Sequence, residues 1–306
     1  MNPESSGADR FPMAMSLEAS GDHSSAAEIL IGLAEEGHSG AVSVFRYHGH
    51  LNPDTDGSPA RTRTIECAAM SGYPQAEYSL GARYIEGFGT SRDPEKGLAW
   101  LQRSVSHGSL DGSYFLGKVL ERKPYNDSET AVELIRDAAD GGHALALNDM
   151  ARRYRDGKGV PRDPVRALEL YASSAERGYW VAARHIAEMY LDGDGVPRDA
   201  GQALEWFCRA ADSGDQESQY QIARMYETGD GVDKDMDEAV RIYALLAINY
   251  SHSARRFCNE AAYRLGMIFE QGIDVPVDLE DAVYWYGRAA DKGHKEARAR
   301  LSELDV

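Results

Sequence analysis

The chain has 306 residues, of which 42% are hydrophobic and 27% are charged. This is enough apolar material for a packed core, which excludes a wholly disordered chain. The formal net charge of −17 disfavours a protein that coats nucleic acid or an anionic membrane surface, and favours a basic protein partner.

The first residues, 1–20, are rich in Ser, Gly and Pro, and they predict a flexible N-terminal tail. They lack the basic segment and apolar run of a secretory signal, and no run along the chain approaches the roughly 20 apolar residues that span a bilayer. Three cysteines without a shared spacing favour neither a disulfide framework nor a zinc site. We therefore expect a cytoplasmic protein with no membrane insertion, although export without an N-terminal signal stays open.

From residue 21 to residue 306 the chain carries an internal repeat of about 36 residues. One marker is a glycine after each helical pattern: Gly37, Gly72, Gly108, Gly142, Gly178, Gly214 and Gly293. A second marker is an aspartate before a helical pattern: Asp93, Asp127, Asp163, Asp199, Asp235 and Asp278. A small residue follows each of these aspartates by twelve positions, so three markers repeat together in one register.

Each unit predicts two helices. The first, called the A helix, places a small residue, a large apolar residue, a Gly or Ala and an aromatic on one face, as in Ala76, Leu80, Gly81 and Tyr84. A Gly-rich loop follows, and then an aspartate that suits an N-cap opens the second or B helix. Because neither helix can bury its apolar face alone, neighbouring pairs must stack, which predicts an all-α solenoid.

The predicted solenoid spans residues 21–306. Its helix pairs are expected at about 39–71, 73–107, 109–141, 143–177, 179–213, 215–250 and 256–292, with a C-terminal cap helix at 294–304. An extra B helix is expected to start at Asp22.

Two segments, Ala76–Val105 and Val181–Gly214, resemble the Sel-1-like repeat family, relatives of the tetratricopeptide repeats. The resemblance implies a right-handed α/α superhelical solenoid of about seven helix pairs, with terminal half-repeats as caps. It also implies a non-catalytic protein-interaction scaffold or adaptor. Some cysteine-rich family members are associated with penicillin binding or β-lactam hydrolysis, but this chain lacks their cysteine pair in each repeat. We therefore expect no enzyme activity.

Three places depart from the repeat. His48–Ser58 and Glu121–Asn126 replace the Gly-rich loops of their units, and we interpret both as drift in exposed loops. Near Asn249–Asn259 the repeat gains seven residues, which predicts that both flanking helices lengthen by about a turn and present Arg255 and Arg256 at a corner.

No cofactor or metal site is indicated. The pair His48 and His50 has no third ligand in view, and the Asp-Gly loops lack the ligand spacing of an EF-hand. Because those loops recur as repeat connectors, we interpret them as structural.

The related tetratricopeptide solenoids bind partners with A helices that line a concave groove. The equivalent face here carries tyrosines toward its ends and arginines at its centre, residue types enriched at interface hot spots. The predicted protein-binding residues are Tyr78, Tyr114, Asn148, Arg152, Arg155, Arg184, Tyr220, Arg224 and Tyr263. The alternative for the tyrosines is packing between neighbouring helices.

The favoured hypothesis is a scaffold or adaptor that binds a partner protein in this groove, such as an immunity protein or a secretion chaperone. Two other classes stay open: a β-lactamase-like hydrolase on a repeat scaffold, and a receptor for peptides or cell-wall fragments. The sequence does not identify the partner.

Overall fold

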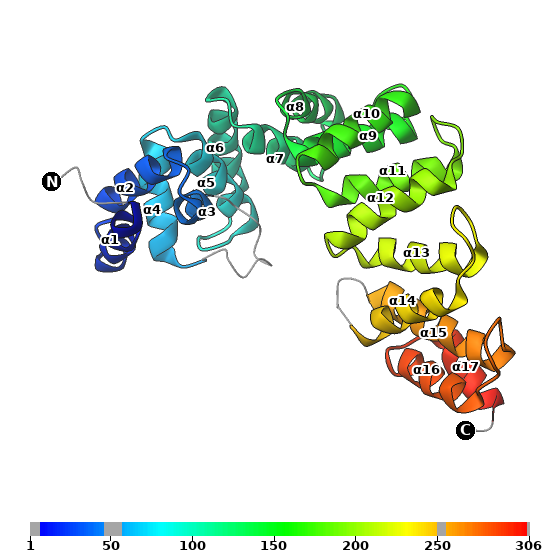
Figure 1. Ribbon diagram of the computed structural model, residues 1–306. Coiled ribbons are helices and arrows are strands. Elements are labelled where there is room, and N and C mark those ends of the chain that lie inside the picture. The colour runs from blue at the N-terminus through cyan, green and yellow to red at the C-terminus, as the bar shows by residue number, and fades with distance from the viewer. Residues whose placement is uncertain (1–6, 46–56, 250–254, 305–306) are drawn as a thin grey trace. The chain divides into compact units, whose positions relative to one another are not determined.

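The computed structural model describes residues 7–45, 57–249 and 255–304, and all the regular elements in these ranges are α-helices (Figure 1). The chain divides into two compact units, Met1–Met150 (unit 1) and Ala151–Val306 (unit 2). The division falls within one helix, whereas the sequence reading treats 21–306 as one array. None of the described helices is long and apolar enough to cross a membrane.

Unit 1 is built from helices that pack mainly on helices near them in the sequence. They are α1 (Gly7–Ser20), α2 (His23–Glu35), α3 (Ser39–Phe45), α4 (Pro59–Met70), α5 (Pro74–Glu86), α6 (Pro94–Ser106), α7 (Leu110–Leu120) and α8 (Ser128–Asp140). The dividing helix is α9 (Ala144–Asp156).

Unit 2 continues the same alternation of A and B helices. They are α10 (Pro164–Glu176), α11 (Trp180–Asp192), α12 (Ala200–Asp212), α13 (Gln216–Thr228), α14 (Met236–Ile248), α15 (Arg255–Gln271), α16 (Leu279–Asp291) and α17 (Lys295–Glu303). The fold is therefore an α-solenoid of stacked helix pairs.

Both predicted helix boundaries are confirmed. Each B helix from α6 to α16 begins after an aspartate whose carboxylate accepts a hydrogen bond from the backbone N–H three residues on, as Asp199 does from Gln202 at 3.0 Å. This satisfies one of the donors that a helix start leaves unpaired. Five of these six helices are followed by a glycine with positive φ, for example +91° at Gly214, a conformation that other residues rarely adopt, whereas α14 is followed by Asn249.

The two helices of a pair approach closely where the sequence supplies small residues. A Cβ added to Gly81 of α5 would lie 2.8 Å from Leu101 Cγ of α6, and one added to Gly97 of α6 would lie 2.8 Å from Ile85 Cγ1 of α5. Such distances are too short for real Cβ atoms, so the glycines permit the packing that the A-helix pattern predicts.

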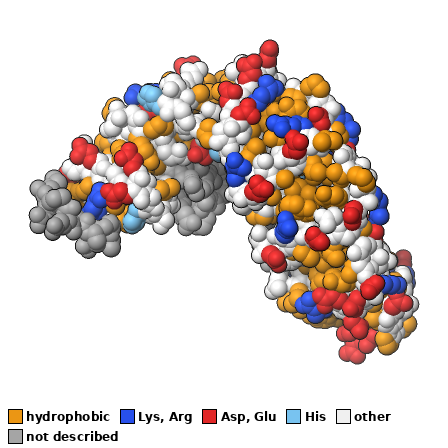
Figure 2. Space-filling view, turned by 45° about the horizontal axis from the view of Figure 1, so that its top comes forward, with side chains coloured by type: hydrophobic (Ala, Val, Ile, Leu, Met, Phe, Trp, Pro, Cys, Tyr) orange, Lys and Arg blue, Asp and Glu red, His pale blue; other side chains and the backbone are white. Residues whose placement is uncertain are grey.

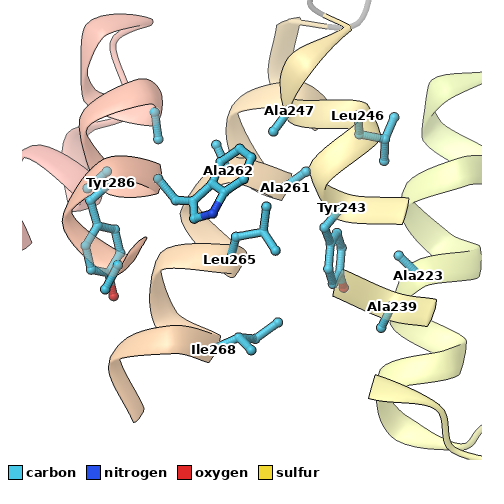
Figure 3. Packing of buried hydrophobic residues seen from close by; sticks show 14 of the residues in the cluster. Ala223, Ala239, Tyr243, Leu246, Ala247, Ala261, Ala262, Leu265, Ile268 and Tyr286 are labelled. Carbon is cyan, nitrogen blue, oxygen red and sulfur yellow. The ribbon is translucent and has the colours of Figure 1, made fainter. Parts of the chain in front are cut away.

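The core of unit 2 alternates large and small side chains. Figure 3 shows Tyr243, Leu246, Leu265 and Ile268 filling the space between α13, α14 and α15, with alanines such as Ala261 at the closest approaches. Each of these large side chains is almost fully buried. Burial of one such side chain contributes about 1.5–3 kcal/mol, so stacking stabilises each pair more than helix propensity does.

The expectation of a loose tail over residues 1–20 is wrong for the part that the structure describes. Residues 7–20 form α1, in which Ala14 is fully buried and Phe11 packs on the core of α2 to α5. Glu18 is buried and pairs with Arg61 of α4 at 2.9 Å. Composition suggested a tail because the apolar residues here are few. The helix α1 nevertheless packs on α2, and α2 is the predicted extra B helix.

The seven-residue insertion lengthens one helix, not two. Helix α14 has 13 residues, like most of its neighbours, whereas α15 has 17. The added first turn of α15 is fixed because Arg255 Nη2 donates to the carbonyl of Lys292, at the end of α16, at 2.5 Å. Arg255 thus caps a neighbouring helix, while residues 250–254 lie outside the described residues.

Candidate functional site

The nine predicted binding residues, named here the tyrosine–arginine strip, lie on A helices in both units. Unit 1 holds Tyr78, Tyr114 and Asn148, and unit 2 holds Arg152, Arg155, Arg184, Tyr220, Arg224 and Tyr263. Within the units, consecutive A helices such as α5 and α7, or α13 and α15, lie against each other.

The strip tyrosines of unit 1 pack within the protein. Tyr78 is only 7% exposed and meets Phe115 edge-on, with ring centroids 5.7 Å apart. The Tyr114 ring lies 5.0 Å from that of His143. Asn148 is half-buried, and its Oδ1 has no hydrogen-bond partner among the described residues. The packing alternative therefore describes Tyr78 well, whereas Tyr114 keeps part of its surface in solvent.

The strip tyrosines of unit 2 also bridge helices. Tyr220 of α13 lies 5.5 Å from the ring of Tyr243 and 5.9 Å from that of Phe257. Tyr263 of α15 stacks on His294, which precedes α17, at 4.5 Å. Both tyrosines remain half-buried, so each presents one edge to solvent while the other holds neighbouring repeats together.

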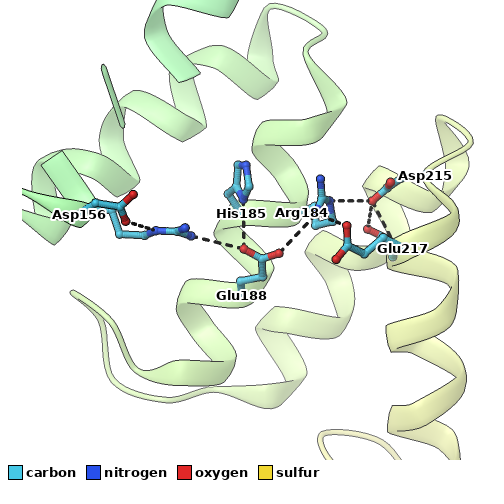
Figure 4. Close-up of polar contacts among 8 residues, drawn as sticks. Asp156, Arg184, His185, Glu188, Asp215 and Glu217 are labelled. Atoms are coloured by element: carbon cyan, nitrogen blue, oxygen red, sulfur yellow. Dashed lines mark hydrogen bonds and ion pairs between the residues drawn. The ribbon is translucent and has the colours of Figure 1, made fainter. Parts of the chain in front are cut away.

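Two of the strip arginines are bound by carboxylates of the same unit. Arg184 of α11 pairs with Asp215 at 3.1 Å and with Glu217 (Figure 4). Arg155 of α9 pairs with Glu188 of α11 at 3.3 Å, and Glu188 also faces Arg184 at 3.6 Å. These ion pairs connect the three consecutive A helices α9, α11 and α13.

The surroundings shift the pKa values of two carboxylates in this network in opposite directions. Burial raises the pKa of Glu188, but a hydrogen bond with His185 and the charges of Arg184 and Arg155 outweigh it and hold that pKa below its usual value. For Glu217 burial dominates and raises the pKa. The network thus places two arginines among carboxylates of neighbouring A helices.

The local charge of the strip consequently differs from the sequence-based expectation. Arg155 and Arg184 are bound by carboxylates of the same unit, and Arg152 and Arg224 are the exposed arginines of the strip. Arg224 Nη1 donates to Gln221 at 3.5 Å. On the face shown in Figure 2, Lys and Arg side chains lie among Asp and Glu. The binding role of the strip stays a prediction.

The sequence reading missed a set of buried charges that connect A helices. Glu227 of α13 is 6% exposed, accepts a 2.9 Å hydrogen bond from the Tyr243 hydroxyl, and pairs with Arg264 of α15. The next repeat contains the equivalent residues Glu270, Tyr286 and Arg300. The signal was available, since the acid precedes its tyrosine by 16 residues in both repeats.

Among the described residues, no three His, Cys, Asp or Glu side chains are grouped so that they could hold a metal ion. The histidine pair that the sequence analysis judged insufficient for a metal site, His48 and His50, lies outside the described residues.

Comparison with known protein families identifies the repeat. The model of the Sel1 repeat matches residues 74–109, 144–179, 180–215, 216–249 and 259–294, which together exceed half of the chain. The chain belongs to the Sel1 repeat family. The pairs that the Sel1 model does not match include α3–α4 and α7–α8, the two in which the sequence lacks the Gly-rich loop.

Solved Sel1 repeat structures resemble most of the chain. A protective antigen of uropathogenic Escherichia coli that displays the same repeat fold is 29% identical, with a TM-score of 0.71. The match covers 91% of this chain but 59% of that one, so this chain spans little more than half of that antigen. A Sel1 repeat protein from Oxalobacter formigenes is 22% identical, with a TM-score of 0.62, and the match covers 92% of this chain and 99% of that one.

Proposed function

We propose that this Sel1 repeat protein is a non-catalytic interaction scaffold that binds a partner protein through the strip in unit 2. The supporting observation is that half-buried Tyr220 and Tyr263 and exposed Arg152 and Arg224 lie on the A helices α9, α13 and α15. Packing fixes the tyrosine rings before binding, which reduces the entropy lost on association. Neither Arg152 nor Arg224 belongs to the residues that define the repeat pattern.

The partner that fits this surface combines a basic exterior with an acidic segment. The net charge of −17 would accelerate encounter with a basic protein, while the acidic segment would reach Arg152 and Arg224. Such a partner is consistent with a dedicated binder, such as an immunity protein or a secretion chaperone. Its association rate should fall as salt rises from 50 to 500 mM, and a rate independent of salt would contradict steering.

The test begins with crosslinking mass spectrometry on the purified full chain and its captured partner. The double variant Arg152→Glu/Arg224→Glu should then weaken the purified complex by about tenfold or more, because two exposed cations become anions. The control Arg136→Glu/Lys158→Glu changes the net charge equally at exposed positions outside the strip. Equal effects of both double variants, in folded protein, would reject the strip as the binding site.

A further inference from the structure

The loops between A and B helices form a ladder in unit 2. Arg162, directly before the N-cap of α10, pairs with Asp194 in the next loop at 2.5 Å. Arg198, directly before the N-cap of α12, pairs with Asp230 in the loop after that at 2.6 Å. Each loop thus supplies a carboxylate to the arginine of the loop before it, 32 residues earlier.

Backbone packing accompanies each of these ion pairs. A Cβ on Gly195 would lie 2.6 Å from Pro164 Cβ at the start of α10, so only glycine lets the loop pack flat on that proline. Gly231 meets Ala200, at the start of α12, in the same way. An Asp-Gly segment therefore covers the α9–α10 loop and the α11–α12 loop.

The α7–α8 loop of unit 1 breaks this ladder. Its segment Glu121–Asn126 is two residues shorter than the regular loop, and Pro124 stands where the partner aspartate would be, 32 residues after Arg92. Arg92 Nε instead donates to the carbonyl of Ile85 at 3.0 Å. Within the described residues the Arg92 guanidinium meets no carboxylate at ion-pair distance, and Pro94 lacks the covering glycine.

The missing cover leaves a hollow of about 900 Å³ between the α5–α6 and α7–α8 loops. Ile85, Leu98 and Val119 line it with apolar surface. Its charged lining residues are Arg92, Arg122 and the exposed Lys123, together with Glu86, Asp93 and Glu95. Arg122 pairs with Glu86 at 3.6 Å. Lys123 forms no ion pair within the described part of the chain. A hollow of this size is within the range of sites that hold small ligands or short peptide segments.

We propose that this hollow binds an acidic Asp-Gly segment of a partner protein. The partner's carboxylate would meet Arg92 and Lys123, and its glycine would lie on Pro94, as Asp194 and Gly195 do on the loop before them. The molecule itself supplies this template twice in unit 2. In the hollow, Arg92 and Lys123 are the cations that pair with no carboxylate of the described residues. The site lies on the loop edge of unit 1, so it is independent of the strip in unit 2.

The probe is a fluorescent peptide with the sequence of this chain's own loop, LDGDGVP (Leu191–Pro197), titrated into the full chain and followed by anisotropy. The control peptide, LDGNGVP, lacks the carboxylate at the position of Asp194. We expect binding of the first peptide, and binding at least about tenfold weaker for the second, because the charge-assisted hydrogen bonds are lost.

Protein variants locate the site. Lys123→Glu and Arg92→Glu should each weaken peptide binding by about tenfold, whereas Lys158→Glu, an exposed change in unit 2, should leave it unchanged. Replacing Glu121–Asn126 with LDGDGVPR restores the regular loop, fills the hollow, and should abolish binding while the helical circular dichroism spectrum is retained.

Three results would overturn the proposal. The first is no binding of LDGDGVP at millimolar peptide concentrations, and the second is unchanged binding in the restored-loop variant. The third is self-association of the unmodified chain in sedimentation velocity that Lys123→Glu removes, since a second copy would then occupy the hollow. None of these results bears on the Arg152→Glu/Arg224→Glu experiment, so the two proposals can fail separately.

Discussion

The buried Glu227–Tyr243 pair predicts a measurable coupling between repeats. Tyr243 is fully buried, and its hydroxyl donates to a carboxylate that is 6% exposed. Tyr243→Phe removes one hydrogen bond to a charged group, which costs about 1.5–3 kcal/mol. Glu227→Leu leaves the hydroxyl buried without an acceptor and removes the carboxylate from Arg264, which costs about 2–4 kcal/mol.

The double variant should cost less than the sum of the two single variants. One repeat earlier, Leu191 and Phe207 occupy the same positions with the same 16-residue spacing, so an apolar pair fits this packing. We expect a coupling free energy of about 1–3 kcal/mol from urea unfolding of the single and double variants. Tyr171→Phe is the matched control, because the buried Tyr171 hydroxyl has no hydrogen-bond partner among the described residues. Additive costs would refute this reasoning.

Two further predictions concern pH and helix capping. The lowered pKa of Glu188 means that the carboxylate stabilises the fold above its unfolded value, near 4.5, and that this contribution disappears as pH falls through the folded value. Glu188→Gln should therefore lower the melting temperature at pH 7, and this loss should become smaller as pH falls below the unfolded value. A loss that is the same at every pH would contradict the assignment. Asp199→Ala removes the N-cap of α12 and should cost about 1 kcal/mol, measured by urea unfolding, whereas Gln202→Ala retains the cap and should cost less.

The regular part of the fold could be predicted because each marker residue acts locally. An aspartate such as Asp163 caps the helix that follows it, and a glycine such as Gly178 ends it, whatever lies elsewhere. The N-terminal helix α1 could not be predicted this way, because its order depends on α2 and α4, against which Phe11 and Glu18 pack.

The candidate site was predicted less well, because the partners of its side chains lie in the next repeat. Arg184 looks like an unexplained cation in its own repeat, but Asp215 and Glu217 neutralise it from 31 and 33 residues further along. Residues one repeat apart lie side by side in a solenoid, so comparing charges at that spacing would have found these pairs. The same comparison would have shown that Arg92 lacks a partner.

The loop ladder also bears on the order in which the chain is completed during synthesis. Asp194 reaches Arg162 across only 32 residues, and Asp230 reaches Arg198 across the same distance. Each of these ion pairs in unit 2 can thus form soon after the next repeat leaves the ribosome, before the C-terminus is synthesised. Contacts this local also favour rapid folding. The growing chain exposes one unfinished repeat at a time, which limits the apolar surface open to aggregation while translation proceeds.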